Sequence, residues 1–152
     1  MSTVLIIVAV IAGSWILLIL TLKGIAALLR KGAVKATRAA LAGEDILKIS
    51  DNVSYLGADF PGPNLPTRTS GVLAVTATRL LFLPWFPRRA ITLPGDTIAA
   101  VGLKDHFGEM AFNIPVLQLK IKGVGAHHGT MAWLAHEPEE WEREIKKAIG
   151  KG

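Results

Sequence analysis

The chain has 152 residues, enough for one domain with an accessory segment but not for two full domains. It contains no cysteine, which excludes disulfides, thiolate nucleophiles and cysteine-ligated metals. Its net charge is +5 and its mean hydropathy is +0.41. These values indicate an anionic partner and an apolar segment, and exclude a highly polar disordered chain.

The N-terminal segment carries no charge from Thr3 to Leu22, and thirteen of these 20 residues are Val, Ile or Leu. A helix of that length spans about 30 Å, the thickness of the hydrocarbon core of a bilayer. A cleaved signal peptide would have a basic start and a shorter apolar core, and a buried core helix is a second alternative. We therefore predict that residues 1–22 form a transmembrane anchor.

The charges around this segment predict its orientation. No Lys or Arg precedes it, and no acidic residue occurs before Glu44. Five basic residues follow it closely: Lys23, Arg30, Lys31, Lys35 and Arg38. By the positive-inside rule, we expect a single-pass membrane protein with its N-terminus outside and its C-terminal domain in the cytoplasm. Because the basic residues lie next to the span, lipid head groups are the expected anionic partner, and nucleic acid is not.

Residues 23–43 are predicted to form a basic, amphipathic juxtamembrane helix that ends at Gly43. Lys31, Lys35 and Arg38 share one face of this helix at i, i+4 and i+7. The small and apolar residues of the other face are Ile25, Leu28, Leu29, Gly32, Ala36, Ala39 and Ala40. Two alternatives remain open: the helix lies on the membrane with its basic face toward anionic lipid, or it only extends the anchor helix.

Residues 44–152 are predicted to form a soluble domain, because the apolar period changes there from 3.6 to about 2. The segment 58–70 contains three prolines and is expected to be a loop. Seven strands are predicted, at residues 44–57, 71–77, 79–85, 90–94, 98–103, 116–122 and 129–135. Short strands at such close spacing are typical of an antiparallel barrel or sandwich.

The chain is expected to end in one amphipathic helix. Pro138 suits its first turn, acidic residues follow, and Gly150 ends it. Trp141, Ile145 and Ile149 repeat at i, i+4 and i+8, so they form an apolar stripe. We expect this stripe to cover the open end of the sheet.

The segment from Gly71 to Phe82 resembles the "GxLxlTxxRLxF" hairpin of GRAM-type domains, and residues 91–98 resemble the segment that follows it. Over residues 44–149 the chain is thus similar to the pleckstrin-homology (PH) superfold, in its GRAM and bacterial PH-like variants. The resemblance implies a mainly β fold, in which a seven-stranded antiparallel barrel is capped by a C-terminal helix. It also implies that Trp141 plugs the barrel.

The sequence shows no pattern of catalytic residues. The only histidines are His106, His127, His128 and His136, and neighbouring residues on a strand point to opposite faces, so we expect no metal site. The glycines at 123 and 125 lack a third glycine at 128 and precede a strand, which argues against a nucleotide fingerprint. We find no nucleophile–base pair. The chain is therefore predicted to be no enzyme and to need no cofactor.

One loop has the composition of a lipid-binding site, because Trp85 and Phe86 adjoin Arg88 and Arg89 at a predicted hairpin tip. Aromatic rings partition to the membrane interface, and arginine pairs with phosphate. The resemblance implies that this loop and the preceding 58–70 loop lie at the same open end of the barrel. Arg68 and Phe60 would then lie at that end as well. The predicted lipid-binding residues are Lys31, Lys35, Arg38, Arg68, Trp85, Phe86, Arg88 and Arg89. Alternatively, Trp85 and Phe86 cap the barrel core and the arginines are solvated.

Together these features predict a membrane-anchored PH- or GRAM-like binding module without catalysis. It would contact anionic phospholipid head groups of a bilayer or dock a protein partner. The alternative is a protein-interaction scaffold within a membrane complex that has no lipid specificity.

Overall fold

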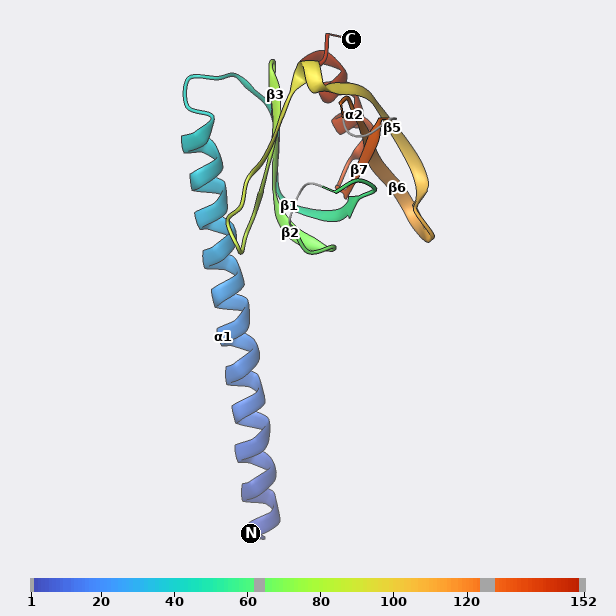
Figure 1. Ribbon diagram of the computed structural model, residues 1–152. Helices are drawn as coiled ribbons and strands as arrows, with labels where there is room; N and C mark the ends of the chain where they lie inside the picture. Colours follow the sequence, from blue (N-terminus) through green and yellow to red (C-terminus); the bar gives the residue numbers. More distant parts are fainter. Residues whose placement is uncertain (1, 62–64, 124–127, 151–152) are drawn as a thin grey trace.

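The computed structural model describes residues 2–61, 65–123 and 128–150. A long N-terminal helix, α1 (Thr3–Ala40), runs beside a single curved sheet (Figure 1). The strands are β1 (Ile46–Ala58), β2 (Thr69–Thr76), β3 (Arg79–Pro84), β4 (Ile91–Pro94), β5 (Ile98–Phe107), β6 (Met110–Ile121) and β7 (Gly129–Leu134). A short 3-10 helix, η1 (Gly95–Thr97), precedes β5, and α2 (Pro138–Ala148) follows β7.

Helix α1 continues without a break through the two segments that were predicted separately, residues 1–22 and 23–43. It ends at Ala40, and Gly43 adopts a φ of 85° in the turn to β1, where glycine carries no steric penalty. In the described part of the chain, α1 is the one helix that is long and apolar enough to cross a membrane, and its most apolar window has no buried residue. The predicted anchor segment and the first part of the predicted juxtamembrane helix are thus one continuous helix.

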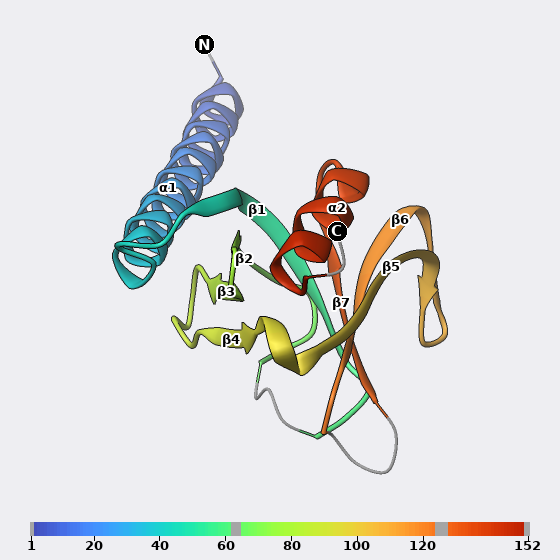
Figure 2. The same ribbon diagram turned by 90° about the horizontal axis from the view of Figure 1, so that it is seen from above.

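The strands form one antiparallel sheet in the order β4-β3-β2-β1-β7-β6-β5. The long strand β1 pairs with β2 from Ile46 to Tyr55 and with β7 from Ser54 to Ala58, so it belongs to both halves of the sheet. Register shifts in β1 accompany the bend between these halves. Seen from above, the sheet wraps around a core with α2 at one open side (Figure 2). The predicted seven-stranded fold with a C-terminal helix is confirmed.

Aromatic rings fill the core between the two halves of the sheet. The ring centroids of Tyr55, Phe82 and Trp133 lie 5.7 to 6.2 Å apart, in tilted and edge-on arrangements. Burial raises the pKa of the Tyr55 hydroxyl. Trp141 and Ile145 of α2 are fully buried against this cluster, as the apolar stripe predicted.

Strands β5 and β6 are longer than predicted and meet in a tight turn at Gly108 and Glu109. The sequence between residues 104 and 115 mixes charges, aromatics and Pro115, which conceals the period of two. The predicted polar turn before β7 falls partly on residues 124–127, including His127, which lie outside the described residues.

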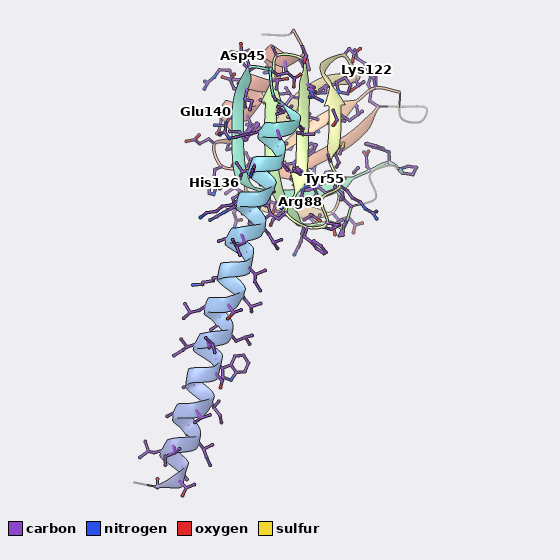
Figure 3. All side chains as sticks on the ribbon, turned by 90° about the vertical axis from the view of Figure 1, so that its left-hand side faces the viewer. Asp45, Tyr55, Arg88, Lys122, His136 and Glu140 are labelled. Carbon is purple, nitrogen blue, oxygen red and sulfur yellow. The ribbon has the colours of Figure 1, made fainter. Side chains whose placement is uncertain are left out.

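The C-terminal third of α1 packs against the outer face of β1, β2 and β3 (Figure 3). Ala33 contacts a cluster with Val72 and Leu83, and Leu41 contacts a second cluster with Ala74 and Leu81. These six side chains are buried, with exposed fractions of at most 7%. This part of α1 is therefore a structural element of the domain.

The side of α1 that faces the sheet differs from the predicted apolar stripe. Ala33 and Thr37 are fully buried, whereas Leu28 is 71% exposed and Ala39 and Ala40 are exposed. The buried positions 33, 37 and 41 follow the spacing i, i+4, i+8. The Thr37 hydroxyl is satisfied by the carbonyl oxygen of Ala33 at 2.8 Å, which allows a polar residue in this contact.

Candidate membrane-contact site

The loop between β3 and β4 contains the predicted cluster of aromatic residues and arginines, and the structure divides it into two groups. Trp85 is half-buried beside Ala33, and its indole N–H donates to the carbonyl oxygen of Asp51 at 3.0 Å. It thus lies at the interface between α1 and the sheet. Trp85 therefore packs outside the core cluster and does not cap the barrel core.

Arg88 also faces α1. Its guanidinium group occupies the space over Gly32 in which a side chain at position 32 would project. Figure 3 shows Arg88 beside the helix, near the lower edge of the domain. Phe86 is 75% exposed, and Arg89 is exposed as well. Arg88 is exposed too, although its guanidinium group lies against α1, so Phe86, Arg88 and Arg89 are the exposed members of the predicted cluster.

Arg68 belongs to the same end of the sheet. It directly precedes β2, whose residue Gly71 pairs with Pro84 at the end of β3. Its Nη2 atom lies 3.9 Å from the Sδ atom of Met110, at the start of β6. Figure 1 shows the β3–β4 loop, the start of β2 and the β5–β6 turn at one end of the domain, where the uncovered part of α1 leaves it. The structure thus groups Arg68 with Phe86 and Arg89.

The basic residues of α1 are placed differently. Lys31, Lys35 and Arg38 are exposed, whereas Ala33 and Thr37 between them face the sheet. At 1.5 Å per residue, Arg38 lies about 24 Å along the helix axis from the end of the apolar segment at Leu22. Lys31 lies nearest to that end, so the three residues form a row along α1 that is separate from the loop site.

Two ionic contacts fix α1 to the domain, and neither was predicted. Arg79 at the start of β3 bonds both carboxylate oxygens of Glu44 and donates from Nη2 to the carbonyl oxygen of Ala40 at 3.0 Å. Arg30 lies 3.6 Å from Asp51, although both side chains are about half exposed. The bidentate pair also satisfies a carbonyl at the end of the helix.

The sequence contains a signal for the packing of α1 on the sheet. Strands β2 and β3 are almost continuously apolar from Gly71 to Val75 and from Leu80 to Leu83. Strands with one solvated face alternate, whereas strands covered on both faces are continuously apolar. These runs indicate a second covering layer, which the structure identifies as α1.

A search of protein-family models and of curated proteins finds no match to the chain. Several solved structures have a similar fold. The N-terminal PH domain of Vps36 is 16% identical with a TM-score of 0.54, over 71% of this chain and 80% of that one. The C-terminal domain of an unknown protein from Leishmania infantum is 16% identical with a TM-score of 0.54, over 80% and 98% of the two chains.

A chain of the 8S snRNP assembly intermediate is 12% identical with a TM-score of 0.52, over 70% of this chain and 84% of that one. At such identities the likeness concerns the fold alone. The fold of the domain is PH-like.

Proposed function

We propose that this chain is a membrane-anchored PH-like binding module. In this proposal Thr3–Leu22 crosses the bilayer and the domain lies at the cytoplasmic face. The observation that carries the proposal is the division of α1: its first part is apolar and uncovered, and its last part is built into the domain. One rigid helix would then determine both the distance and the orientation of the domain relative to the bilayer.

The distances along α1 favour contact between the β3–β4 loop and the same bilayer. Gly32, which contacts the loop, lies about 15 Å beyond Leu22 along the axis. Ile25 and Leu28 are apolar and exposed, and Lys23 can extend toward the head groups from a deeper position. A tilted helix holds the mainly apolar stretch from Thr3 to Leu28 in the hydrocarbon core with Leu28 at its edge, and Gly32 then lies only about 6 Å further along the axis, in the head-group layer.

Phe86 and Arg89 are the residues that we assign to lipid contact. An exposed aromatic ring suits the interface, and a guanidinium group pairs with lipid phosphate. Arg68 adds a second cation from the neighbouring loop. As expected from the sequence, the proposal includes no catalytic step, cofactor or nucleic-acid partner.

The absence of cysteine from the chain permits a direct test. Phe86→Cys, carrying a spin label, is reconstituted as full-length protein in liposomes with anionic lipid, and the accessibility of the label to oxygen and to a water-soluble nickel complex is measured. We expect the label at position 86 to be accessible to oxygen and shielded from nickel. The control is Ala77→Cys, at the exposed β2–β3 turn on the opposite end of the domain, where the label should be accessible to nickel.

Charge is tested in the same experiment. Arg89→Glu should raise the nickel accessibility of the label at position 86 in anionic liposomes but not in zwitterionic ones, whereas Arg143→Glu on the exposed side of α2 should not. Equal nickel accessibility at positions 86 and 77 would contradict lipid contact. That result, combined with a stoichiometric protein partner from membranes, would favour the scaffold alternative.

A further inference from the structure

The far ends of β5 and β6 bend over the outer face of the sheet, on the side away from α1 (Figures 1 and 2). The register of β5 and β6 shifts between Lys104 and His106, where the bend occurs. The side-chain amide of Gln118 donates to the carbonyl oxygen of His106 and holds the bent strand. The aromatic residues of the bent hairpin pack in an apolar cluster on this face: Phe107 and Phe112 with Leu56, Val116, Ala132 and Leu134.

A glycine in β1 lies at van der Waals contact distance from the bent hairpin. Gly57 has a φ of 140°, which L side chains rarely adopt, and the Phe107 ring lies 3.5 Å from the position that its Cβ atom would take. The bend is therefore part of the folded core on this side rather than a loose hairpin end.

The bent hairpin encloses a pocket of about 360 Å³ against the end of β1 and the start of β7. This volume is within the range of small-molecule sites in proteins. The polar lining residues are Asp59, Lys104, His106, Gln118 and Thr130, and Ala58 and Phe107 contribute apolar surface.

The carboxylate in this pocket is already engaged. Asp59 Oδ1 accepts the backbone N–H of Thr130 at 2.6 Å, and the Asp59 N–H donates to the Thr130 carbonyl oxygen at 3.0 Å. In contrast, Lys104 makes no ion pair with any residue that the structure describes. Asp59 keeps its negative charge, so the cationic character of the site comes from Lys104 and from the neighbouring hollow.

A second hollow of about 210 Å³ adjoins the first along β5 and β6, and Lys104 and Gln118 line both. Its far end carries Lys120, and no carboxylate lines it. The hollow exists because Ala100 and Gly102 of β5 are small where they pair with Lys120 and Gln118 of β6. The two hollows thus form one groove, which carries the ammonium groups of Lys104 and Lys120 and the side-chain amide of Gln118.

We propose that this groove binds a small, soluble organic anion of the phosphate-monoester class. Lys104 and Gln118, which line both hollows, would hold the phosphate group. Ala58 and the Phe107 ring would contact the carbon body of the ligand, and Lys120 would add attraction from the far end. The described residues that line the two hollows include none from the β3–β4 loop, so the ligand would not share the contacts that we assign to Phe86 and Arg89.

The test uses the full-length protein in neutral detergent micelles, with phenyl phosphate, inorganic phosphate and phenol as probes in titration calorimetry. We expect saturable, one-to-one binding of phenyl phosphate, weaker binding of inorganic phosphate and no binding of phenol. Lys104→Met should weaken phenyl phosphate binding on the order of tenfold, as loss of a charged hydrogen bond predicts. Lys35→Met, which removes the same charge from exposed α1, should leave binding unchanged.

A second variant keeps the test decisive if Lys104→Met impairs folding. A Cβ atom at Gly102 would have nothing within 4 Å, so Gly102→Leu adds bulk to the groove without a clash and leaves every charge in place. It should also reduce phenyl phosphate binding.

The proposal would be overturned if phenyl phosphate showed no saturable binding at millimolar concentration, or if Lys104→Met and Lys35→Met bound it equally. Displacement of phenyl phosphate by anionic phospholipid added to the micelles would also overturn it, because that result would assign the groove to lipid. Phe86→Ser with Arg89→Glu should leave phenyl phosphate binding intact. Failure here is thus distinguishable from failure of the membrane-contact proposal.

Discussion

The guanidinium group of Arg88 lies over Gly32 of α1, in the space that a side chain at position 32 would fill. Arg79 holds the same helix at its end, through Glu44 and the carbonyl oxygen of Ala40. These two contact points are about 12 Å apart along the helix axis. Because Arg79 and a buried apolar seam hold α1, the helix cannot rotate on the sheet without breaking both.

The first prediction concerns the boundary of the soluble domain. A fragment that begins at Glu44 lacks the part of α1 that covers Val72, Ala74, Leu81 and Leu83. Exposure of this apolar face should make the fragment 44–152 associate and bind a hydrophobic dye. The fragment 27–152, which retains the packed part of α1, should be monomeric by light scattering and bind little dye. Equal behaviour of the two fragments would show that α1 is dispensable for the domain.

The second prediction concerns the close approach of Arg88 to α1. Gly32→Leu should displace the exposed guanidinium group of Arg88, so it should gain less than the ~1 kcal/mol that replacing a helical glycine otherwise contributes to the free energy of unfolding. The gain should be larger in an Arg88→Ala background, where that space is empty. Ala39→Leu, on the exposed side of α1, is the matched control and should cost little. Urea unfolding of the four variants measures the coupling, and strict additivity would contradict the contact.

The third prediction concerns the pair that joins β3 to the end of α1. Arg79→Ala should destabilise the domain by about 1–2 kcal/mol, because it removes charged hydrogen bonds that are about one-third exposed. Arg79→Lys should restore only part of the lost free energy of unfolding, since lysine cannot make the bidentate contact that the guanidinium group makes with Glu44. Lys146→Ala, which removes an exposed pair within α2, should change thermal unfolding much less. A full rescue by lysine would rule out the bidentate geometry as the cause.

The fourth prediction concerns Lys48, which joins β1 to α2. Its Nζ atom lies 2.9 Å from Glu140 and 3.1 Å from Glu137, over the Trp141 ring. The hydrogen bond that Lys48 donates to Glu140 raises the pKa of Lys48, and the same bond, followed by the hydrogen bond with Glu137, lowers the pKa of Glu140. The Lys48 side chain is only 18% exposed, so the contacts are partly shielded from water.

The sign of the pH dependence follows from these directions. The contribution of Glu140 is present above its ordinary pKa of 4.5 and is lost as the pH falls through its lowered pKa. The contribution of Lys48 is complete below its ordinary pKa of 10.5 and is lost as the pH rises through its raised pKa. Between pH 5 and pH 3, wild-type protein should therefore lose more unfolding free energy than Lys48→Met. Lys147→Met, an exposed control, should keep the wild-type slope.

Local patterns were sufficient to predict most elements of this fold. The β2–β3 hairpin, β4, β7 and α2 lie within two residues of their predicted ranges. Alternation along a strand and an apolar stripe on a helix are properties of short segments, so they can be read without knowing the partner surface. The β5–β6 hairpin is the exception, because Phe107 and Phe112 become an apolar face only when the hairpin bends over the sheet.

The uncharged length of Thr3–Leu22 and the row of basic residues after it are fixed by the sequence itself. The placement of Trp85 and Arg88 was decided only by the tertiary structure. Both side chains suit lipid by their chemistry, and both lie against α1, because a buried Ala33 and the absent side chain of Gly32 leave room for them. Which side of a helix made of small residues meets a sheet depends on the shape of that sheet, which lies outside any local pattern.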